Sequence, residues 1–279
     1  MITFTFETDF YFMQSKLLFS VFYFLSLALL ARSQELSDDM PKVFYKNEKI
    51  VGIQLNTNGW GIGYRYGDRI NYFEKRLYEV DLSLIKHSKE IRSSSTFISS
   101  ESIIFGKLNY VFDLRLGYGK QKVLFNKRNP GSVAIRYFYS VGPSVAFLKP
   151  IYYKILYPVS DSLYGVSEEK FNPDIHAPGD INGKSSFFTG IDEIRVIPGA
   201  YFKLGFNFEF SQAETLVHAL EAGVMLQAYL DQLDIMAVDN NQQFYFTLFV
   251  SYKFGKIVNA QEISESYLKK RQKRIKIFN

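Results

Sequence analysis

The sequence predicts an all-β fold: a transmembrane antiparallel up-and-down β-barrel of about eight strands, with a long extracellular loop and a short C-terminal extension. Three observations lead to this prediction: an export-type N-terminus, a repeated two-residue alternation of apolar and polar side chains, and an aromatic composition that is not hydrophobic on average. The 279 residues include 27 Phe and 20 Tyr, yet the mean hydropathy is -0.08. A barrel whose lipid-facing apolar residues alternate with lumen-facing polar residues produces this balance.

Residues 1–33 are expected to form a cleavable signal peptide. The apolar run at 17–30 has fourteen residues, which is short for a transmembrane helix but suits the core of a signal peptide. Ala31-Arg32-Ser33 places small residues at the two positions that a signal peptidase reads, so we expect cleavage after Ser33. The alternative is a membrane anchor that is never cleaved.

The remaining chain is expected to have three parts. A periplasmic N-terminal segment spans 34–49, an outer-membrane β-barrel spans 50–256, and a basic periplasmic tail spans 257–279. The absence of cysteine excludes disulfides, thiolate nucleophiles, cysteine metal sites and a lipoprotein anchor.

Much of the net charge of +5 lies in the C-terminal tail. A nucleic-acid-binding protein more often carries its basic excess across the fold, so we expect no nucleic-acid partner. The tail is either a solvated extension or a contact for anionic lipid, peptidoglycan or an envelope protein. Its candidate contact residues are Lys269, Lys270, Arg271, Lys273, Arg274 and Lys276.

The period of alternation identifies the strands, since an amphipathic helix would need a period of 3.6 residues. In 198–210, for example, Phe202 and Phe206 alternate with Lys203 and Asn207. Runs of roughly 9–11 residues cross a bilayer as tilted strands. The expected strands are 50–66, 76–85, 108–118, 133–141, 145–156, 198–210, 217–230 and 244–254.

Two of these assignments depend on local signals. Residues 50–55 alternate in the opposite phase to 58–66, so a bulge or break is expected near Asn56–Asn58. Gly142-Pro143 is a strong turn signal, and it separates 133–141 from 145–156. The even strand count, which suits bacterial barrels, depends on that separation.

The expected connections agree only in part with a periplasmic N-terminus. The predicted extracellular connections are 67–73, about 120–131, 157–195 and 231–242, and the predicted periplasmic ones are 86–104, 142–144 and 211–215. The longest connection, 157–195, is then outside, and long loops are often functional, so we expect it to be the interaction surface. The connection 86–104 is too long for a periplasmic turn, which counts against the register or the orientation there.

A secreted β-sandwich would also show alternating strands. The barrel is favoured because nearly every strand has an apolar face, whereas sandwiches usually include solvated edge strands. Tyr and Phe crowd the strand ends, as in the aromatic girdles at membrane interfaces. The last strand ends on Tyr252-Lys253-Phe254, and such an aromatic ending resembles the terminal strand of outer-membrane proteins.

The lumen is expected to be filled by a charge network. An eight-stranded barrel holds only side chains or one small ligand, and buried charges must pair. A narrow conduit or a proton-linked site is the alternative to a salt-bridged core. The predicted inward residues are Arg65, Glu79, Asp81, Asp113, Arg115, Arg136, Lys203, Glu209, Glu221 and Lys253.

No residue is predicted to be catalytic, and no cofactor or metal site is predicted. His218 lies on the predicted lipid face, but no Ser stands two residues away on that face, so an interfacial aromatic role is favoured over hydrolysis. Asp180-Ile181-Asn182-Gly183 resembles part of a calcium loop but lacks the spaced ligands and the closing Glu. An Asx-turn explains that stretch better.

Four segments resemble a group of largely uncharacterised outer-membrane barrels of the Bacteroidota. These segments are Asn56–Arg65, Gly106–Asn109, Arg136–Ser140 with Gly142-Pro143-Ser144, and Pro198–Phe210. The group lies near the superfamily that includes the PorT-like and OmpA-membrane-domain-like proteins, and the resemblance covers most of 50–256. It implies an envelope location and a barrel, and it assigns no catalytic residue.

The sequence therefore predicts a non-enzymatic barrel in the outer membrane of a Gram-negative cell. We expect it to be a structural or accessory subunit of an envelope complex for secretion, outer-membrane protein insertion or nutrient uptake. The expected partners are outer-membrane lipids, lipopolysaccharide and other outer-membrane or periplasmic proteins. Two alternatives are an outer-membrane lipid-modifying enzyme and a narrow small-solute channel.

Overall fold

The computed structural model describes residues 46–94, 102–127, 132–160, 163–177, 179–211, 215–237 and 241–259. The chain divides into two compact units, Met1–Lys42 and Val43–Asn279, and every described residue belongs to the second. The expected signal peptide and the six basic residues of the tail lie outside the described residues. The structure therefore concerns the expected barrel and a few residues on either side of it.

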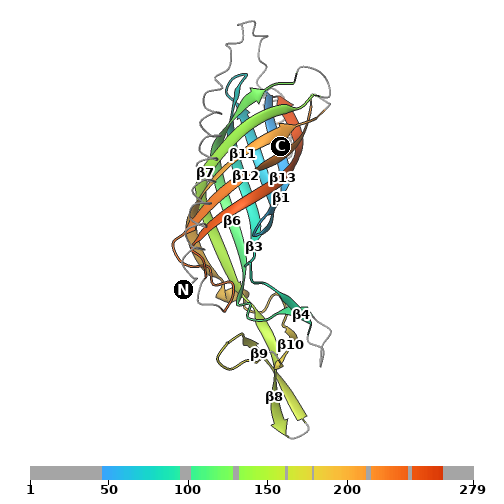
Figure 1. Cartoon of the computed structure of the whole chain (residues 1–279), viewed down its shortest axis with the longest axis vertical. Coiled ribbons are helices and arrows are strands. Elements are labelled where there is room, and N and C mark those ends of the chain that lie inside the picture. Colours follow the sequence, from blue (N-terminus) through green and yellow to red (C-terminus); the bar gives the residue numbers. More distant parts are fainter. Residues whose placement is uncertain are drawn as a thin grey trace, which may run out of the picture. The chain divides into compact units, whose positions relative to one another are not determined.

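Eight antiparallel strands close into a barrel in which each strand lies beside the next one in the chain (Figure 1). The closure pairs the first strand with the last, from Lys46 opposite Asn259 to Asn56 opposite Phe249. The predicted fold class, an up-and-down barrel of eight strands, is confirmed. The barrel strands are β1 (Lys46–Asn56), β2 (Gly59–Arg69), β3 (Glu74–Ile85), β6 (Asn109–Phe125), β7 (Ala134–Pro150), β11 (Arg195–Glu209), β12 (Leu216–Tyr229) and β13 (Phe244–Asn259).

Two predicted strand assignments are wrong, and their errors cancel in the count. The expected single strand 50–66 is two strands, β1 and β2, joined by a tight hairpin at Thr57 and Asn58. The hairpin requires Gly59, whose φ is 151° and where an added Cβ would lie 1.9 Å from the Leu84 carbonyl oxygen. The change of phase near Asn56–Asn58 therefore marks a reversal of the chain, not a bulge.

Gly142-Pro143 is not a turn. Both residues lie inside β7, opposite Tyr201 and Ala200 of β11. The glycine lets β6 approach closely, because a Cβ at Gly142 would lie 1.9 Å from the Leu116 carbonyl oxygen. Proline lacks the N–H that a ladder needs, and the paired register between β6 and β7 is interrupted at Gly142-Pro143.

The second half of the predicted strand 145–156 belongs to a separate sheet. After Pro150 the chain continues as β8 (Tyr152–Ser160), which lies between β9 (Leu163–Lys170) and β10 (Ile181–Lys184). Two shorter strands, β4 (Arg92–Ser94) and β5 (Ser102–Ile104), form a ribbon, and η1 (Ile191–Glu193) precedes β11. A separate apolar core joins these pieces, and its buried members are Ile103, Ile151, Tyr153, Ile155, Phe171 and Ile181.

The corrected strand order sorts the connections by length. One end of the barrel, here called the loop end, carries the hairpin at 57–58 and the connections 86–108, 151–194 and 230–243. The opposite end, the turn end, carries both ends of the barrel chain and the connections 70–73, 126–133 and 210–215. The expected grouping of the connections is therefore wrong. The connection 86–104 lies at the same end as 157–195, whereas the connections expected at about 67–73 and 120–131 lie at the opposite end.

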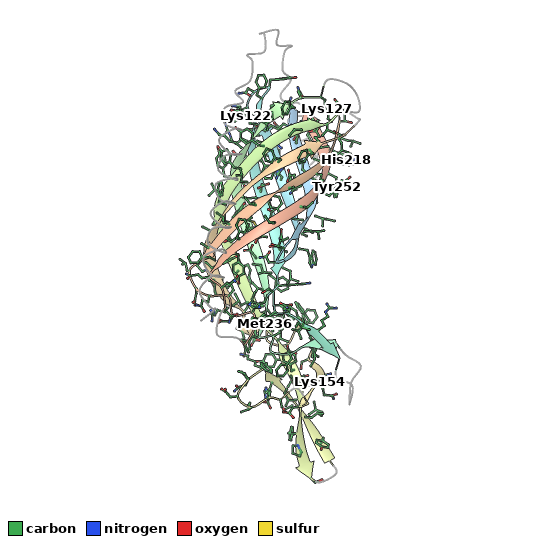
Figure 2. All side chains as sticks on the ribbon, in the orientation of Figure 1. Lys122, Lys127, Lys154, His218, Met236 and Tyr252 are labelled. Carbon is green, nitrogen blue, oxygen red and sulfur yellow. The ribbon has the colours of Figure 1, made fainter. Side chains whose placement is uncertain are left out.

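Side chains alternate between the lumen and the exterior on every barrel strand (Figure 2). The exterior is apolar, with Leu55 at 64% and Phe246 at 65% exposure. An apolar surface of this extent does not face water on a soluble monomer, and it is what a hydrocarbon layer covers. Within the described part of the chain, no helix has the length and apolarity to cross a membrane.

Candidate functional site

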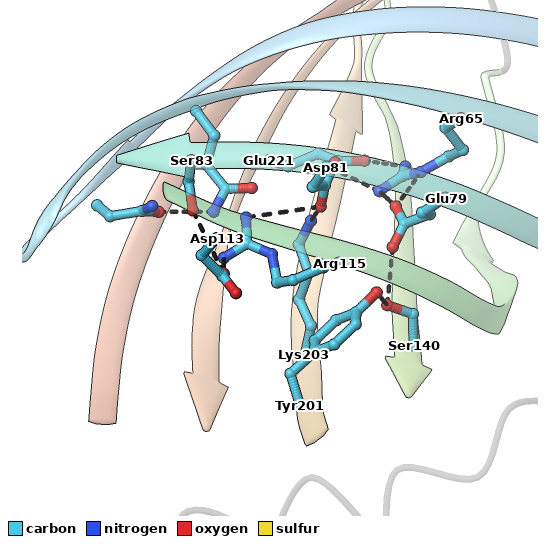
Figure 3. A network of polar contacts seen from close by, with 12 residues as sticks. Arg65, Glu79, Asp81, Ser83, Asp113, Arg115, Ser140, Tyr201, Lys203 and Glu221 are labelled. Carbon is cyan, nitrogen blue, oxygen red and sulfur yellow. Dashed lines mark hydrogen bonds and ion pairs between the residues drawn. The ribbon is translucent and has the colours of Figure 1, made fainter. Parts of the chain in front are cut away.

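The centre of the lumen is occupied by Arg65 of β2 and two carboxylates (Figure 3). The Arg65 guanidinium lies 2.5 Å from Glu79 Oε1. It also forms a forked pair with Glu221, in which one N–H donates to Oε2 at 2.9 Å. A planar guanidinium suits this bidentate geometry better than an ammonium would. The Ser140 hydroxyl donates to Glu79 at 2.7 Å, and the Asn207 amide donates to Glu221 at 2.8 Å.

A second group of charges lies farther toward the loop end. Lys203 Nζ donates to Asp81 Oδ2 at 3.2 Å, and Arg115 lies 3.2 Å from Asp113 and 3.9 Å from Asp81. The Gln227 amide donates to Asp113 at 2.8 Å. These side chains are buried, so their interactions compensate a large desolvation cost.

A third group closes the lumen near the turn end. Arg136 pairs with Glu209, and Lys127 Nζ lies 3.0 Å from the same carboxylate. Lys75 pairs with Glu48 nearby on β3 and β1. The three groups lie one after another along the lumen, from the loop-end side through the centre to the turn-end side.

The structure places all ten predicted inward charges inside the barrel, each less than a tenth exposed. Nine of them take part in the ion pairs given above. For Lys253, no carboxylate of the described ranges lies within 4.0 Å of Nζ, and its side chain lies over Gly52, where a Cβ would meet Lys253 Cδ at 2.4 Å.

Sequence reasoning missed the pair of Glu48 and Lys75. Both follow the inward phase of their strands, two residues before the buried Ile50 and Leu77. Extending each alternation by one step would have found them. With this pair, six buried bases face six buried acids in the lumen, the bases being Arg65, Lys75, Arg115, Arg136, Lys203 and Lys253 and the acids Glu48, Glu79, Asp81, Asp113, Glu209 and Glu221.

Apolar side chains fill the space between the charges. Phe138, Tyr201, Met225 and Phe249 form a buried cluster with Leu77. The Arg65 guanidinium carbon lies 4.9 Å from the Phe138 ring centroid, and Lys203 Nζ lies 5.1 Å from that of Phe249. Rings against cations add a favourable interaction. The lumen is therefore a packed polar core.

His218 lies on the exterior near the turn end, as Figure 2 shows together with Tyr252, Lys122 and Lys127. Its Nδ1 lies 3.0 Å from the Tyr252 hydroxyl, and its ring stacks at 6.5 Å on Phe210. A hydrolytic triad would need a serine and a carboxylate at the imidazole. Neither is among the hydrogen-bond partners of His218 in the described residues. The geometry matches an aromatic belt.

The residues around Asp180, whose sequence resembles part of a calcium loop, form a local turn. The carboxylate of Asp180 accepts a hydrogen bond from the Ala177 backbone N–H at 2.9 Å. His176 Nδ1 accepts one from the Asn172 N–H at 3.0 Å. These bonds shape the chain before β10. The described ranges contain no group of three or more His, Asp or Glu residues arranged to hold a metal ion.

Comparisons with known proteins give likenesses of structure only. No protein-family model and no curated protein matches the sequence, so the resemblance to barrels of the Bacteroidota stays a prediction. Neisserial surface protein A matches with a TM-score of 0.37 and 8% identity over 77% of this chain and 98% of that one.

Two further solved structures are similar at the same level. The N-terminal β-barrel domain of Pseudomonas aeruginosa OprF matches with a TM-score of 0.31 and 10% identity, over 75% of this chain and 97% of that one. The attachment invasion locus protein Ail of Yersinia pestis, in complex with the heparin analogue sucrose octasulfate, has a TM-score of 0.34 and 9% identity, over 77% and 98%. At such identities no residue role is transferred from these proteins to this chain.

Proposed function

We propose that this chain is a non-enzymatic outer-membrane barrel that serves as an accessory subunit of an envelope complex and binds its partner through the β8–β9 hairpin. The observation that carries the proposal is a set of exposed apolar side chains on that hairpin, at the loop end. Tyr164 at 68% and Val166 at 53% exposure share one face of the hairpin, and Tyr157 at 47% lies on the other face, since it stands opposite Gly165. Val159, beside the register shift, is 56% exposed. Exposed apolar side chains outside a membrane mark protein interaction sites.

The proposed orientation places the turn end in the periplasm and the loop end outside the cell. Short turns together with both chain ends of the barrel are typical of the periplasmic side of outer-membrane barrels, and long connections are typical of the outer side. This orientation removes the conflict at 86–104. It presents the hairpin to an outer-membrane or surface-exposed partner.

The two alternative functions have weaker support. A small-solute channel needs a continuous water path, whereas the lumen here is packed with paired charges and aromatic rings. A lipid-modifying enzyme needs an activated nucleophile, and the hydrogen bond and ring contacts of the His218 imidazole in the described residues are to Tyr252 and Phe210. Binding through the loop end agrees best with the geometry.

The test is affinity purification of the full-length chain from gently solubilised outer membranes. We expect fixed partners to copurify with the wild type and to be lost, by about tenfold or more, from the double variant Tyr164→Ser/Val166→Ser, because buried aromatic and aliphatic anchors dominate interface energy. The matched control is Lys154→Ser/Glu168→Ser, which alters a polar pair opposite each other on the same hairpin. A chain recovered from the soluble periplasm would refute the membrane placement, and equal recovery with both variants would refute the hairpin interface.

A further inference from the structure

The barrel wall has a notch at the loop end, above the β1–β2 hairpin. The wall is low there because β1 and β2 turn at Thr57 and Asn58. On one side β13 extends farther, since Phe244–Leu248 pair with β12 but lie beyond the last β1 pair, Asn56 opposite Phe249. On the other side the Lys86 N–H donates to the Asn58 carbonyl at 2.7 Å, and the chain continues into the connection toward β4. A cavity of about 730 Å³ occupies this notch.

The notch is strongly basic. Among the described residues, Lys86, Arg92, Lys107 and Lys184 line it together with one acid, Glu90. Glu90 already pairs with Lys107 at 2.8 Å, and both side chains are buried. Burial lowers the pKa of Lys107, and the charges of Lys184 and Lys86 lower it further against the opposing effect of Glu90. The cations are therefore close enough to repel one another, and an anion between them would relieve that repulsion.

Two residues that line the notch each carry a buried polar atom without a partner. Neither the Tyr245 hydroxyl nor the Asn58 side-chain nitrogen forms a hydrogen bond within the described structure. Tyr245 as a whole is only 7% exposed. A buried donor without an acceptor costs free energy, so both groups favour a ligand that brings oxygen atoms.

The outer rim of the notch includes two aromatic rings that face outward. Trp60 and Phe246, both on the exterior of the barrel, line it with exposures of 49% and 65%. The exterior around the notch is the surface that hydrocarbon covers in the proposed membrane placement. A hydrated ion would contact the cations of the notch but not the Trp60 and Phe246 rings. An amphiphile would contact the cations with its polar head and the two rings with its apolar part.

An apolar groove of about 510 Å³ adjoins the notch on the exterior of the barrel. It shares Tyr245 and Phe246 with the notch, so the two hollows lie on either side of β13. The groove exists because two small residues, Ala200 and Ala228, stand opposite each other on β11 and β12. Its volume and apolar lining suit a hydrocarbon chain.

We propose that the notch and the groove together bind one phosphorylated acyl lipid of the surrounding membrane leaflet, with the phosphate among the notch cations and an acyl chain in the groove. This inference rests on the proposed membrane placement and is independent of the β8–β9 interface. Lysine and arginine charges attract phosphate. The same lining includes Tyr245 and Asn58, whose side-chain donors have no acceptor of their own in the described structure. In the proposed orientation the leaflet is the outer one, so the occupant is a phosphorylated glycolipid.

The test measures binding of bisphosphorylated lipid A to the full-length protein in a detergent without phosphate. Two further probes are the same lipid without its phosphates and inorganic phosphate alone. Native mass spectrometry and titration give the bound fraction and the dissociation constant. Heat-modifiable gel mobility verifies that each variant is folded, so that a loss of binding is not a loss of structure.

We expect Lys86→Gln/Arg92→Gln to weaken lipid A binding by about tenfold, because two partly exposed charge contacts are lost. The matched control, Lys120→Gln/Lys122→Gln, removes the same charge on β6 toward the turn end and should change little. Ala228→Leu fills the groove and should weaken binding of the acylated probe severalfold.

Three results would overturn the proposal. Equal binding of the lipid without phosphates would remove the role of the cations. Inorganic phosphate that binds as tightly as lipid A would indicate a site for a free anion. A larger loss with the turn-end control than with the notch variant would place the lipid at the wrong end. None of these results affects the copurification test, because the variants leave Tyr164 and Val166 unchanged.

Discussion

At the scale of single residues, Arg65 determines how the lumen is held together. Its guanidinium joins β2 to β3 through Glu79 and to β12 through Glu221, with side chains that are essentially unexposed. Removing one partner of such a buried pair leaves a charge without full compensation. The stability of the barrel should therefore depend strongly on these carboxylates.

Glu221→Gln should lower the free energy of unfolding by about 3–5 kcal/mol. The amide keeps the size of the side chain but removes the charge that Arg65 pairs with. Denaturant titration of the protein folded in detergent, followed by gel mobility, measures the change. The control is Glu193→Gln, which alters an exposed pair with Lys170 and should leave the midpoint where it is. Equal changes in the free energy of unfolding for both variants would mean that the buried Arg65–Glu221 pair contributes no more to stability than the exposed pair.

The inward charges were predictable for a simple reason. In a strand the side of each residue follows from parity alone, so Lys203 and Glu209 had to share the face of Asn207 once the period was known. Parity does not tell which charges meet, because pairs such as Arg65 with Glu221 join residues 156 positions apart. Their pairing depends on the closure and shear of the barrel, which no local pattern contains.

At the scale of elements, β7 explains where the sequence misled. Gly142-Pro143 has the composition of a turn, yet the chain continues through it in register with β11. Gly142 has a reason to be there that only the neighbouring strand reveals, namely the close approach of the Leu116 carbonyl. Similarly, the hairpin at Thr57 and Asn58 was hidden because its two strands differ only in phase.

Substitutions at Gly142 and Pro143 distinguish a strand from a turn at these residues. Gly142→Val should destabilise the barrel by about 1–3 kcal/mol or prevent its folding, because the new Cβ overlaps the β6 backbone. Pro143→Ala should change stability by no more than about 0.5 kcal/mol, since Pro143 is exposed and fixes no turn. The folded fraction by heat-modifiable mobility reports both. A larger destabilisation by Pro143→Ala than by Gly142→Val would instead support a turn at these residues.

The loop-end sheet shows the limit of sequence analysis at this scale. The 157–195 connection was identified as an interaction surface but not as part of a folded unit. Its core joins residues from three separate connections: Ile103 from 86–108, Tyr153 and Phe171 from 151–194, and the partly buried Ala237 from 230–243. The Tyr153 hydroxyl donates to the carbonyls of Ile104 at 3.1 Å and Lys107 at 2.9 Å, so one side chain organises a distant segment.

At the scale of the whole barrel, balanced charge and packed rings make the lumen a core. Six bases face six acids, and the cluster of Phe138, Met225 and Phe249 fills the gaps. Planar bilayers containing the purified protein should therefore show no steady conductance at any voltage. The triple variant Arg65→Met/Glu79→Gln/Glu221→Met should stay closed as well, because neutral side chains of similar size replace all three charges without opening space. Stable single-channel steps in the wild type would refute the packed lumen.

The ion pairs also have a consequence for assembly. A slip of one residue in the pairing of any strand exchanges its two faces. In β11 such a slip would move Lys203 and Glu209 into hydrocarbon and Phe202 and Leu204 into the lumen. Each cation near the middle of a bilayer costs about 2–4 kcal/mol, so misregistered intermediates are selected against before the barrel closes. The alternating charges of the lumen face thereby disfavour incorrect strand order and register during assembly.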